Sequence, residues 1–289
     1  MVPLVGAIYG SDPSALFDGD KLWIVTGGAA LEVRTTIDLV NVEPATRIFE
    51  QAPSWVADAV PEAQGIWSPE LAHFGGLYHL YYAVSSIGSS RSCIGHATTD
   101  LLDIASEWLD SGPVICTAES DDFNAIDPNI LQTPDGQIWL AFGSYSSGIK
   151  LVQLDAAGAR TVSEPLSVAA RPDDGGALQA AALAQHGEFY YLFVSFGAGT
   201  SHRLMAGRAR AIEGPYLDRA GRALLEGGGT PLLEPSTRFV GAGSNDIFLI
   251  GERSYNIFHA YDEQDSGRAK LRLASLAWDV AGWPISGGP

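Results

Sequence analysis

Five copies of one hairpin pattern occur along the chain of 289 residues, and this repeat restricts the fold more than any other feature of the sequence. Each copy has a polar residue, often beside proline, then a short apolar run, a glycine turn and an aromatic-rich run, as in DPSALFDGDKLWIVTGG from Asp12. The other four copies begin at Ser68, Asp127, Gln179 and Ser244. Apolar or β-rich segments on both sides of a glycine turn predict a β-hairpin.

The turn glycines recur at nearly regular intervals. They are separated by 57, 60, 51 and 64 residues, at Gly19, Gly76, Gly136, Gly187 and Gly251. A period of roughly 40–60 residues, with about four strands in each unit, is typical of a β-propeller blade. A two-sheet sandwich also contains hairpins, but it does not predict evenly spaced copies of one hairpin type. We therefore predict an all-β fold, a five-bladed β-propeller, that forms a single domain over residues 1–289.

Composition excludes several classes of protein. A hydrophobic content of 46% is too high for a disordered chain, and a net charge of −17 argues against nucleic-acid binding. No apolar run reaches the roughly 18 residues that a membrane-spanning helix needs, so we expect no membrane partner. No basic segment opens the chain, so no signal peptide is visible. We expect a cytoplasmic protein, or a secreted or periplasmic one whose leader was removed, and a monomer or small oligomer.

The chain has two cysteines, Cys93 and Cys116, which lack the paired spacing of a zinc site. They can form a disulfide only if adjacent strands bring them together. We expect them to be free thiols in the core.

The repeat also predicts where polar side chains gather. The first strand of each propeller blade runs beside the central channel, so a residue just before that strand lies at one mouth of the channel. Five such positions should converge on one pocket: Asp12, Ser68 or Glu70, Asp127, Gln179 and Ser244. Convergent polar groups among aromatic residues predict a small-molecule site. The alternative is structural, because Asp-Pro is also a common way to open a turn.

A pair of carboxylates in such a pocket suits the hydrolysis of a glycosidic bond with inversion. One carboxylate activates a water molecule, and a carboxylic acid on the other side protonates the leaving oxygen. Trp and Tyr rings supply flat apolar faces on which sugar rings can lie.

Several motifs make the chain similar to a known family. The segments NAIDP at 124–128, WLAFGSYSSGIKLVQLD at 139–155 and GSSRSCIGHAT at 88–98 resemble the arabinanases of glycoside hydrolase family 43. Further segments continue the resemblance in order over nearly the whole chain. The resemblance implies a five-bladed propeller that hydrolyses α-1,5-linked L-arabinofuranosides with inversion, so we expect arabinan or arabino-oligosaccharide as the ligand.

The resemblance also implies roles for individual residues. Asp12 matches the general base of the family, and Asp127 matches the carboxylate that orients and tunes the general acid. The general acid itself is a Glu in a Glu-Ala-Pro context, whereas this chain has Gln179 followed by two alanines. Four residues in or beside the matching motifs are our candidates for sugar binding, namely Trp67, Asn124, Ser144 and Phe196.

Gln179 has no proton acidic enough to protonate a leaving alkoxide. It is either an engineered change, or a mark of a natural, non-hydrolytic relative, or a sign that a nearby carboxylate acts as the acid instead. The carboxylates considered for that role are Asp173, Asp174 and Glu188. Further departures from the family pattern favour natural divergence, and they fall at Ser11, Ala181 and Ser244.

Ser244 also bears on metal binding, because it stands where the family has a His near a central ion. A hydroxyl is a poorer ligand than imidazole, so we assign no metal residue, although the family can hold a central Ca²⁺. We expect an arabinanase-type hydrolase without a certain cofactor. The alternatives are a pseudoenzyme that binds arabino-oligosaccharides without cleaving them, and a glycosidase for another pentoside such as a xyloside.

Overall fold

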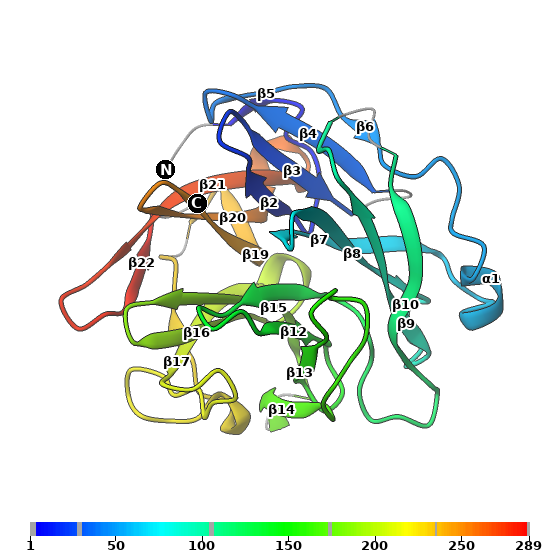
Figure 1. The fold of residues 1–289 in the computed structure, drawn as a ribbon. Coiled ribbons are helices and arrows are strands. Elements are labelled where there is room, and N and C mark those ends of the chain that lie inside the picture. Colours follow the sequence, from blue (N-terminus) through cyan, green and yellow to red (C-terminus); the bar gives the residue numbers. More distant parts are fainter. Residues whose placement is uncertain (1–3, 28–30, 104–106, 173–174, 235, 288–289) are drawn as a thin grey trace.

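Each predicted glycine turn joins the two inner strands of a four-stranded antiparallel sheet. The structure is a computed structural model that describes residues 4–27, 31–103, 107–172, 175–234 and 236–287. Over these residues, five such sheets stand round a common centre, and their inner strands face it (Figure 1). The five-bladed propeller predicted from the repeat is therefore confirmed.

The strands of each blade follow one another along the chain, from the inner to the outer edge. Blade 1 contains β2 (Ser14–Phe17), β3 (Leu22–Thr26), β4 (Glu32–Thr36) and β6 (Thr46–Arg47). Blade 2 contains β7 (Gly65–Phe74), β8 (Leu77–Ser85), β9 (Ser92–Thr99) and β10 (Leu109–Thr117). Blade 3 contains β11 (Asn129–Gln132), β12 (Ile138–Phe142), β13 (Ile149–Leu154) and β14 (Leu166–Ala169).

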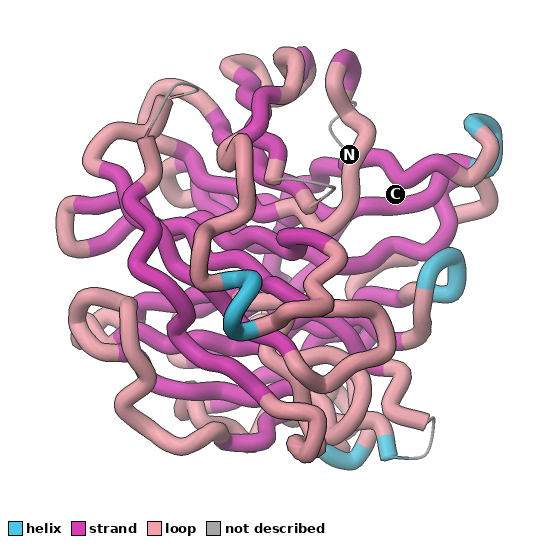
Figure 2. The backbone as a smooth tube through the Cα atoms, turned by 90° about the vertical axis from the view of Figure 1, so that its right-hand side faces the viewer, coloured by secondary structure: helices cyan, strands magenta, loops and turns pink. Residues whose placement is uncertain are grey.

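Blade 4 contains β15 (Leu178–His186), β16 (Phe189–Phe196), β17 (Arg203–Ala209) and β18 (Thr230–Pro231). Blade 5 contains β19 (Phe239–Ile250), β20 (Arg253–Asp262), β21 (Arg268–Trp278) and β22 (Pro284–Ser286). Outside the blades, β1 (Val5–Gly6) pairs in parallel with β5 (Asn41–Val42). Helical segments are short and lie in the connections, as Figure 2 shows, at α1 (Val56–Ala59), η2 (Gly199–Ser201), η3 (Leu224–Glu226) and η4 (Glu263–Asp265). No helix in the described part of the chain has the length and apolar character to cross a membrane.

The second strand of a blade shows how neighbouring blades pack. All five residues of β3 are buried, because a neighbouring blade covers each face of the sheet. Side chains alternate between the two faces of a strand. Leu22 and Ile24 therefore pack against blade 5, while Trp23 and Val25 pack against blade 2. Similar apolar clusters fill the other interfaces between blades, which makes the ring the hydrophobic core of the protein.

The ring closes between the last blade and the first. The inner strand β19 contacts β2, just as the inner strands of the other neighbouring blades contact one another. Leu271 N donates a hydrogen bond to Ile8 O at 2.7 Å, and Tyr9 forms an isolated β-bridge with Lys270. Closure therefore depends on side-chain packing and a few hydrogen bonds, because blades 1 and 5 are built from strands at opposite ends of the chain.

The expectation of two free thiols is wrong. Cys93 and Cys116 are joined by a disulfide, with their Cα atoms 4.1 Å apart. They face each other across the antiparallel pair β9 and β10, where Cys116 is the register partner of Cys93. The condition stated for a disulfide, that adjacent strands bring the two residues together, is met through irregularities in β10 that shift its register.

Candidate active site

Five equivalent residues, one at the start of each blade, have a left-handed backbone. Their φ angles are 50°, 40°, 54°, 46° and 47°, at Asp12, Ser68, Asp127, Ala180 and Ser244. A residue other than glycine in this conformation costs of order 1–3 kcal/mol, and such residues cluster at functional sites. Gln179 was predicted to be the fourth member, but a bulge between Gln179 and Ala181 puts Ala180 there instead. Gln179 lies one residue earlier, beside these five residues.

A pocket of about 530 Å³ opens at this end of the channel, and we call it the entrance pocket. Five of the seven predicted site residues line it, namely Asp12, Trp67, Asn124, Asp127 and Gln179. The other lining residues come from the inner strands of blades 2 and 5, from the end of β8 and from three loops, at Ser68, Ala83, Ser85, Ser86, Ile87, Gly88, Ser89, Ser90, Ile126, Tyr145, Ser146 and Ser244. Residues far apart in the sequence thus meet in one site.

The remaining two predicted residues do not line the entrance pocket. Ser144 is buried behind it and acts through Asp127, to which its hydroxyl donates a hydrogen bond. Phe196 belongs to the apolar core between blades 3 and 4, and the Arg171 guanidinium lies 4.1 Å from the centre of its ring. The structure therefore gives Ser144 a supporting position and places Phe196 outside the pocket.

Asp12 is held at the closure between blades 5 and 1. Its backbone N–H donates to Nδ1 of His259 at 3.2 Å, and Ser11 Oγ donates to its Oδ2 at 3.0 Å. His259 is buried, and burial lowers the pKa of its imidazole, so the ring is neutral and can accept this bond. The Asp12 side chain is 31% exposed, which leaves its carboxylate open to water in the pocket.

Asp127 occupies the equivalent place in blade 3, in a more enclosed setting. Burial and the nearby negative charge of Asp12 raise its pKa to about 6. Hydrogen bonds from the Ser144 and Ser68 hydroxyls and from the Ala180 backbone N–H act in the opposite direction and favour the ionised form. Two carboxyl groups with different environments therefore share one pocket, an arrangement typical of acid–base catalysis.

Gln179 is surrounded by acceptors. Its Nε2 donates to Gly197 O at 2.9 Å and lies 2.8 Å from Nε2 of His202. Burial, followed by the effect of His259, lowers the pKa of His202 to about 4, so the imidazole is neutral and its Nε2 accepts the second amide proton. Burial raises the pKa of the Tyr145 phenol, and a hydrogen bond with the Gln179 side chain lowers it. Gly197 and His202, which hold Nε2 of Gln179, do not line the entrance pocket.

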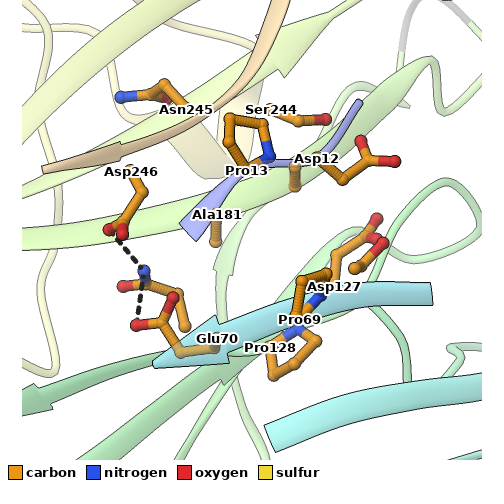
Figure 3. A pocket seen from close by; sticks show the side chains of 13 residues that line it. Asp12, Pro13, Pro69, Glu70, Asp127, Pro128, Ala181, Ser244, Asn245 and Asp246 are labelled. Atoms are coloured by element: carbon orange, nitrogen blue, oxygen red, sulfur yellow. Dashed lines mark hydrogen bonds between the residues drawn. The ribbon is translucent and has the colours of Figure 1, made fainter. Parts of the chain in front are cut away.

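A second polar layer lies two residues deeper in the channel. Ser14 Oγ lies 2.8 Å from Glu70 Oε2 and 3.0 Å from Asp246 Oδ2, and Asn129 Nδ2 donates to both carboxyl groups. Burial and the mutual repulsion of the two carboxyl groups raise the pKa of Glu70, and burial raises that of Asp246 to about 6. A small inner pocket lies between the two layers, and Figure 3 shows the Glu70 and Asp246 carboxyl groups on its opposite side from those of Asp12 and Asp127. The second layer closes the floor of the site.

Glu70 was one of two candidates for the blade 2 position, and Ser68 takes that position while Glu70 belongs to the floor. The sequence reasoning missed His202, His259 and Tyr145. Only Tyr145 had an available signal, since it directly follows Ser144 in a predicted motif. His259 approaches the site from β20, and His202 approaches it from the loop between β16 and β17.

The side chains of the site offer few ligands for a metal ion. The ion position of the resembling family corresponds to Ser244, which offers a single hydroxyl. No group of three or more His, Cys, Asp or Glu side chains in the described residues is placed to hold a metal ion. These side chains do not fit a bound cation, and we derive no step through one.

The fold and site define a propeller with two acidic groups in an open pocket at one end of its channel. The family model of the glycosyl hydrolases family 43 matches residues 4–284. The chain therefore belongs to family 43 of the glycosyl hydrolases.

Known relatives within this family are arabinan-degrading enzymes. The extracellular endo-α-(1→5)-L-arabinanase 1 of Bacillus subtilis is 38% identical over 94% of this chain and 86% of its own length. The extracellular exo-α-(1→5)-L-arabinofuranosidase ArbA of Cellvibrio japonicus is 34% identical over 94% and 85%. The structure of an endo-arabinanase from Bacillus licheniformis has a TM-score of 0.94 and 37% identity, and it covers 99% of this chain and 100% of that one. The chain is thus a glycoside hydrolase of arabinanase type.

Proposed function

We propose that the entrance pocket binds α-1,5-linked L-arabinofuranosyl chains and that Asp12 directs water to the anomeric carbon with inversion. The observation that carries this proposal is the shared pocket of Asp12 and Asp127, in a chain similar to arabinanases. Asp12 is exposed enough to hold a water molecule, and it accepts a proton from that water as the oxygen attacks. Attack from the face opposite the leaving group inverts the anomeric centre.

Asp127 supplies charge in this proposal. Its pKa of about 6 makes it ionised at neutral pH, where its carboxylate stabilises positive charge that develops on the sugar ring. The hydroxyls of Ser144 and Ser68 hold the carboxylate in place. Trp67, from the start of blade 2, supplies an apolar ring in the same pocket.

The leaving oxygen has no carboxylic acid at position 179. Glu188 does not replace it, because it lies beyond the far end of β15 and forms an ion pair with Arg210. At about 3.3 Å per residue, this is more than ~20 Å along the strand from Gln179. Asp173 and Asp174, the other candidates, lie outside the described residues. We therefore propose that the leaving group departs without strong acid assistance, and that leaving groups that are themselves acidic depart fastest.

A specific observation favours a second function, the binding of arabino-oligosaccharides without cleavage. Gln179 is held by Gly197 and His202, groups that complement an amide. A carboxylate in this place would face a carbonyl oxygen and a neutral imidazole nitrogen.

Digestion of arabino-oligosaccharides by the natural chain and by Gln179→Glu separates the two functions. General acid assistance contributes about 10²–10⁴-fold, so we expect Gln179→Glu to accelerate cleavage of oligosaccharides by about that factor. An aryl arabinofuranoside with an acidic phenol should gain much less, because that leaving group needs little protonation. Gln185→Glu makes the same chemical change on an exposed part of β15 and serves as the control.

Each outcome of this assay has a distinct meaning. Cleavage of the aryl substrate by the natural chain supports the hydrolase, and binding with no cleavage of either substrate supports the second function. Preference for xylo-oligosaccharides over arabino-oligosaccharides would replace the proposed substrate. Failure to bind any pentose oligomer would contradict both functions.

We also propose that the protein works outside the cytoplasm. Two arabinan-degrading relatives are named extracellular, and disulfides such as Cys93–Cys116 persist in oxidising compartments. Fractionation of the producing cells tests this, and recovery in the cytoplasm with free thiols would contradict it.

A further inference from the structure

The disulfide lies near the end of an edge strand. β10 is the outermost strand of blade 2, and it pairs only with β9 among the described strands. Its ladder is interrupted twice, between Asp110 and Gly112 and between Pro113 and Ile115. Thr117 ends the strand, and Cys116 is its last residue but one. The covalent link therefore joins the end of an edge strand to its one described neighbour, beyond both irregularities.

A chain of hydrogen bonds begins at the next rung. The backbone N–H of Ala125 donates to Ser92 Oγ at 2.8 Å, and Ser92 Oγ lies 2.9 Å from Thr117 Oγ1. Both hydroxyls can also donate to Ser90 O, from Thr117 Oγ1 at 2.6 Å and from Ser92 Oγ at 3.2 Å. Ser92 and Ala125 are fully buried, and Thr117 is 5% exposed. We call Ser92 and Thr117 the hydroxyl pair.

The hydroxyl pair holds the segment that carries Asp127. Ala125 precedes Asp127 by two residues, in the connection that crosses from the outer strand of blade 2 to the inner strand of blade 3. Ser92 and Thr117 are register partners, directly beside Cys93 and Cys116 on the same two strands. At the other end of the relay, Ser90 lines the entrance pocket. The disulfide is thus linked, through the hydroxyl pair and one buried N–H, to the segment that carries Asp127, and through Ser90 to the rim of the entrance pocket.

We propose that the Cys93–Cys116 disulfide and the hydroxyl pair are positioning elements for Asp127. This inference rests on the role of Asp127 in the proposed function. The disulfide keeps the end of β10 against β9, so that Thr117 stays within reach of Ser92 and both hold the Ala125 N–H. Without the link, the last rung opens more often and the segment leading to Asp127 loses its anchor on the blade 2 side.

The test compares two ways of weakening β10. The double variant Cys93→Ala/Cys116→Ala removes the link, and Thr117→Val removes one hydroxyl while it keeps the link. The control is Asp110→Ala, at the other end of β10, where the Asp110 carboxylate accepts bonds from Trp55 Nε1, the Tyr82 hydroxyl and Gly112 N. Peptide mapping without reductant first establishes that the link exists in the natural chain.

Hydrogen exchange at the Ala125 amide gives a measurement that does not depend on catalysis. Loss of a typical hydrogen bond changes an equilibrium by about tenfold, so we expect exchange to quicken by about tenfold in both test variants. The Asp110→Ala control should destabilise the blade and leave the Ala125 amide protected. Equal exchange in the control and the test variants would overturn the proposal, as would finding free thiols in the natural chain.

Kinetics with an aryl arabinofuranoside provide the second measurement. Small displacements of a catalytic group can cost up to about 10²-fold in rate, and we expect kcat to fall by about tenfold in the test variants with KM within about twofold. If kcat falls only in proportion to the loss of melting temperature, as expected for Asp110→Ala, the disulfide stabilises the protein without positioning Asp127, and the proposal is overturned. If the natural chain cleaves nothing, the proposed hydrolysis fails, while the exchange result still decides whether the disulfide positions this segment.

Discussion

Asp127 and Gln179 stand near the start of the inner strands of blades 3 and 4, and each is held by the loop between the second and third strands of its own blade. In blade 3, that loop offers a donor, the hydroxyl of Ser144. In blade 4, it offers acceptors, the carbonyl of Gly197 and the neutral imidazole of His202. The two blades use the same architecture with opposite hydrogen-bond polarity.

This difference shows that the role of residue 179 depends on the hydrogen-bonding groups around it. Donors stabilise a carboxylate, so blade 3 is suited to an ionised Asp127. Acceptors stabilise an amide or a protonated carboxyl group, so a Glu at 179 would be favoured in its protonated form. Blade 4 thus suits a proton-carrying acid, but it holds an amide that cannot release a proton.

The largest expected effect comes from removing the charge in blade 3. Asp127→Asn should lower kcat on an aryl arabinofuranoside by about 10²–10³-fold, because a preorganised charge is lost from the site. Asp135→Asn, in the exposed turn of the same blade, is the control and should have no effect. Activity within a few-fold of the natural chain would remove Asp127 from the mechanism.

The pH dependence should show one titrating limb. Since the Asp127 pKa is raised to about 6 and the ionised form is the one required, kcat/KM should fall about tenfold from pH 7 to pH 5. Gln179 does not titrate, so activity should not decline on the alkaline side until another group intervenes. Gln179→Glu should add an alkaline limb, because its protonated form is then needed. A rise in activity toward pH 5 in the natural chain would instead identify Asp127 as a proton donor.

Weakening the donor in blade 3 should move that limb. Ser144→Ala removes a hydrogen bond that lowers the pKa of Asp127, so the acidic limb should shift to higher pH. We expect activity to fall several-fold at pH 6 and to change little at pH 8. An unchanged limb would mean that Ser144 acts only by supporting the backbone of Ala180, to which it is also bonded.

The corresponding change in blade 4 should be smallest. His202→Ala removes an acceptor of Gln179, and we expect binding of arabino-oligosaccharides to weaken about 2–10-fold, as for one hydrogen bond. The acidic limb should stay in place, because His202 does not contact Asp127. Titration calorimetry measures the affinity, and a shifted limb would show that the two blades are coupled more closely than their contacts indicate.

The fold could be predicted from sequence because the signal repeats. The five turn glycines all have positive φ, and each lies in the turn between the two inner strands of its blade. The convergence of Asp12 and Asp127 followed from the same repeat, since a residue just before an inner strand has no other place than the channel mouth.

What the sequence could not predict depends on register and on contacts between blades. The bulge between Gln179 and Ala181 makes Ala180, not Gln179, the equivalent of Asp12 and Asp127. The spacing of the repeat does not reveal this bulge. Phe196 ends an aromatic run whose pattern is compatible with either the pocket or the core, and in the structure it packs in the core. The Cys93–Cys116 link depended on two shifts within β10. His259 reaches Asp12 from a position 247 residues later in the chain.

Asp12 depends on the junction between blades 1 and 5 for its support, whereas Asp127 does not. Asp12 N–H bonds to His259 across the junction of the first and last blades, and Ala15 N donates to Asp246 at 2.8 Å across the same junction. A transient parting of these two blades separates the proposed base from its support, while Asp127 and Gln179 keep theirs. On heating, separation of blades 1 and 5 should therefore abolish activity at a lower temperature than the one at which the whole protein unfolds.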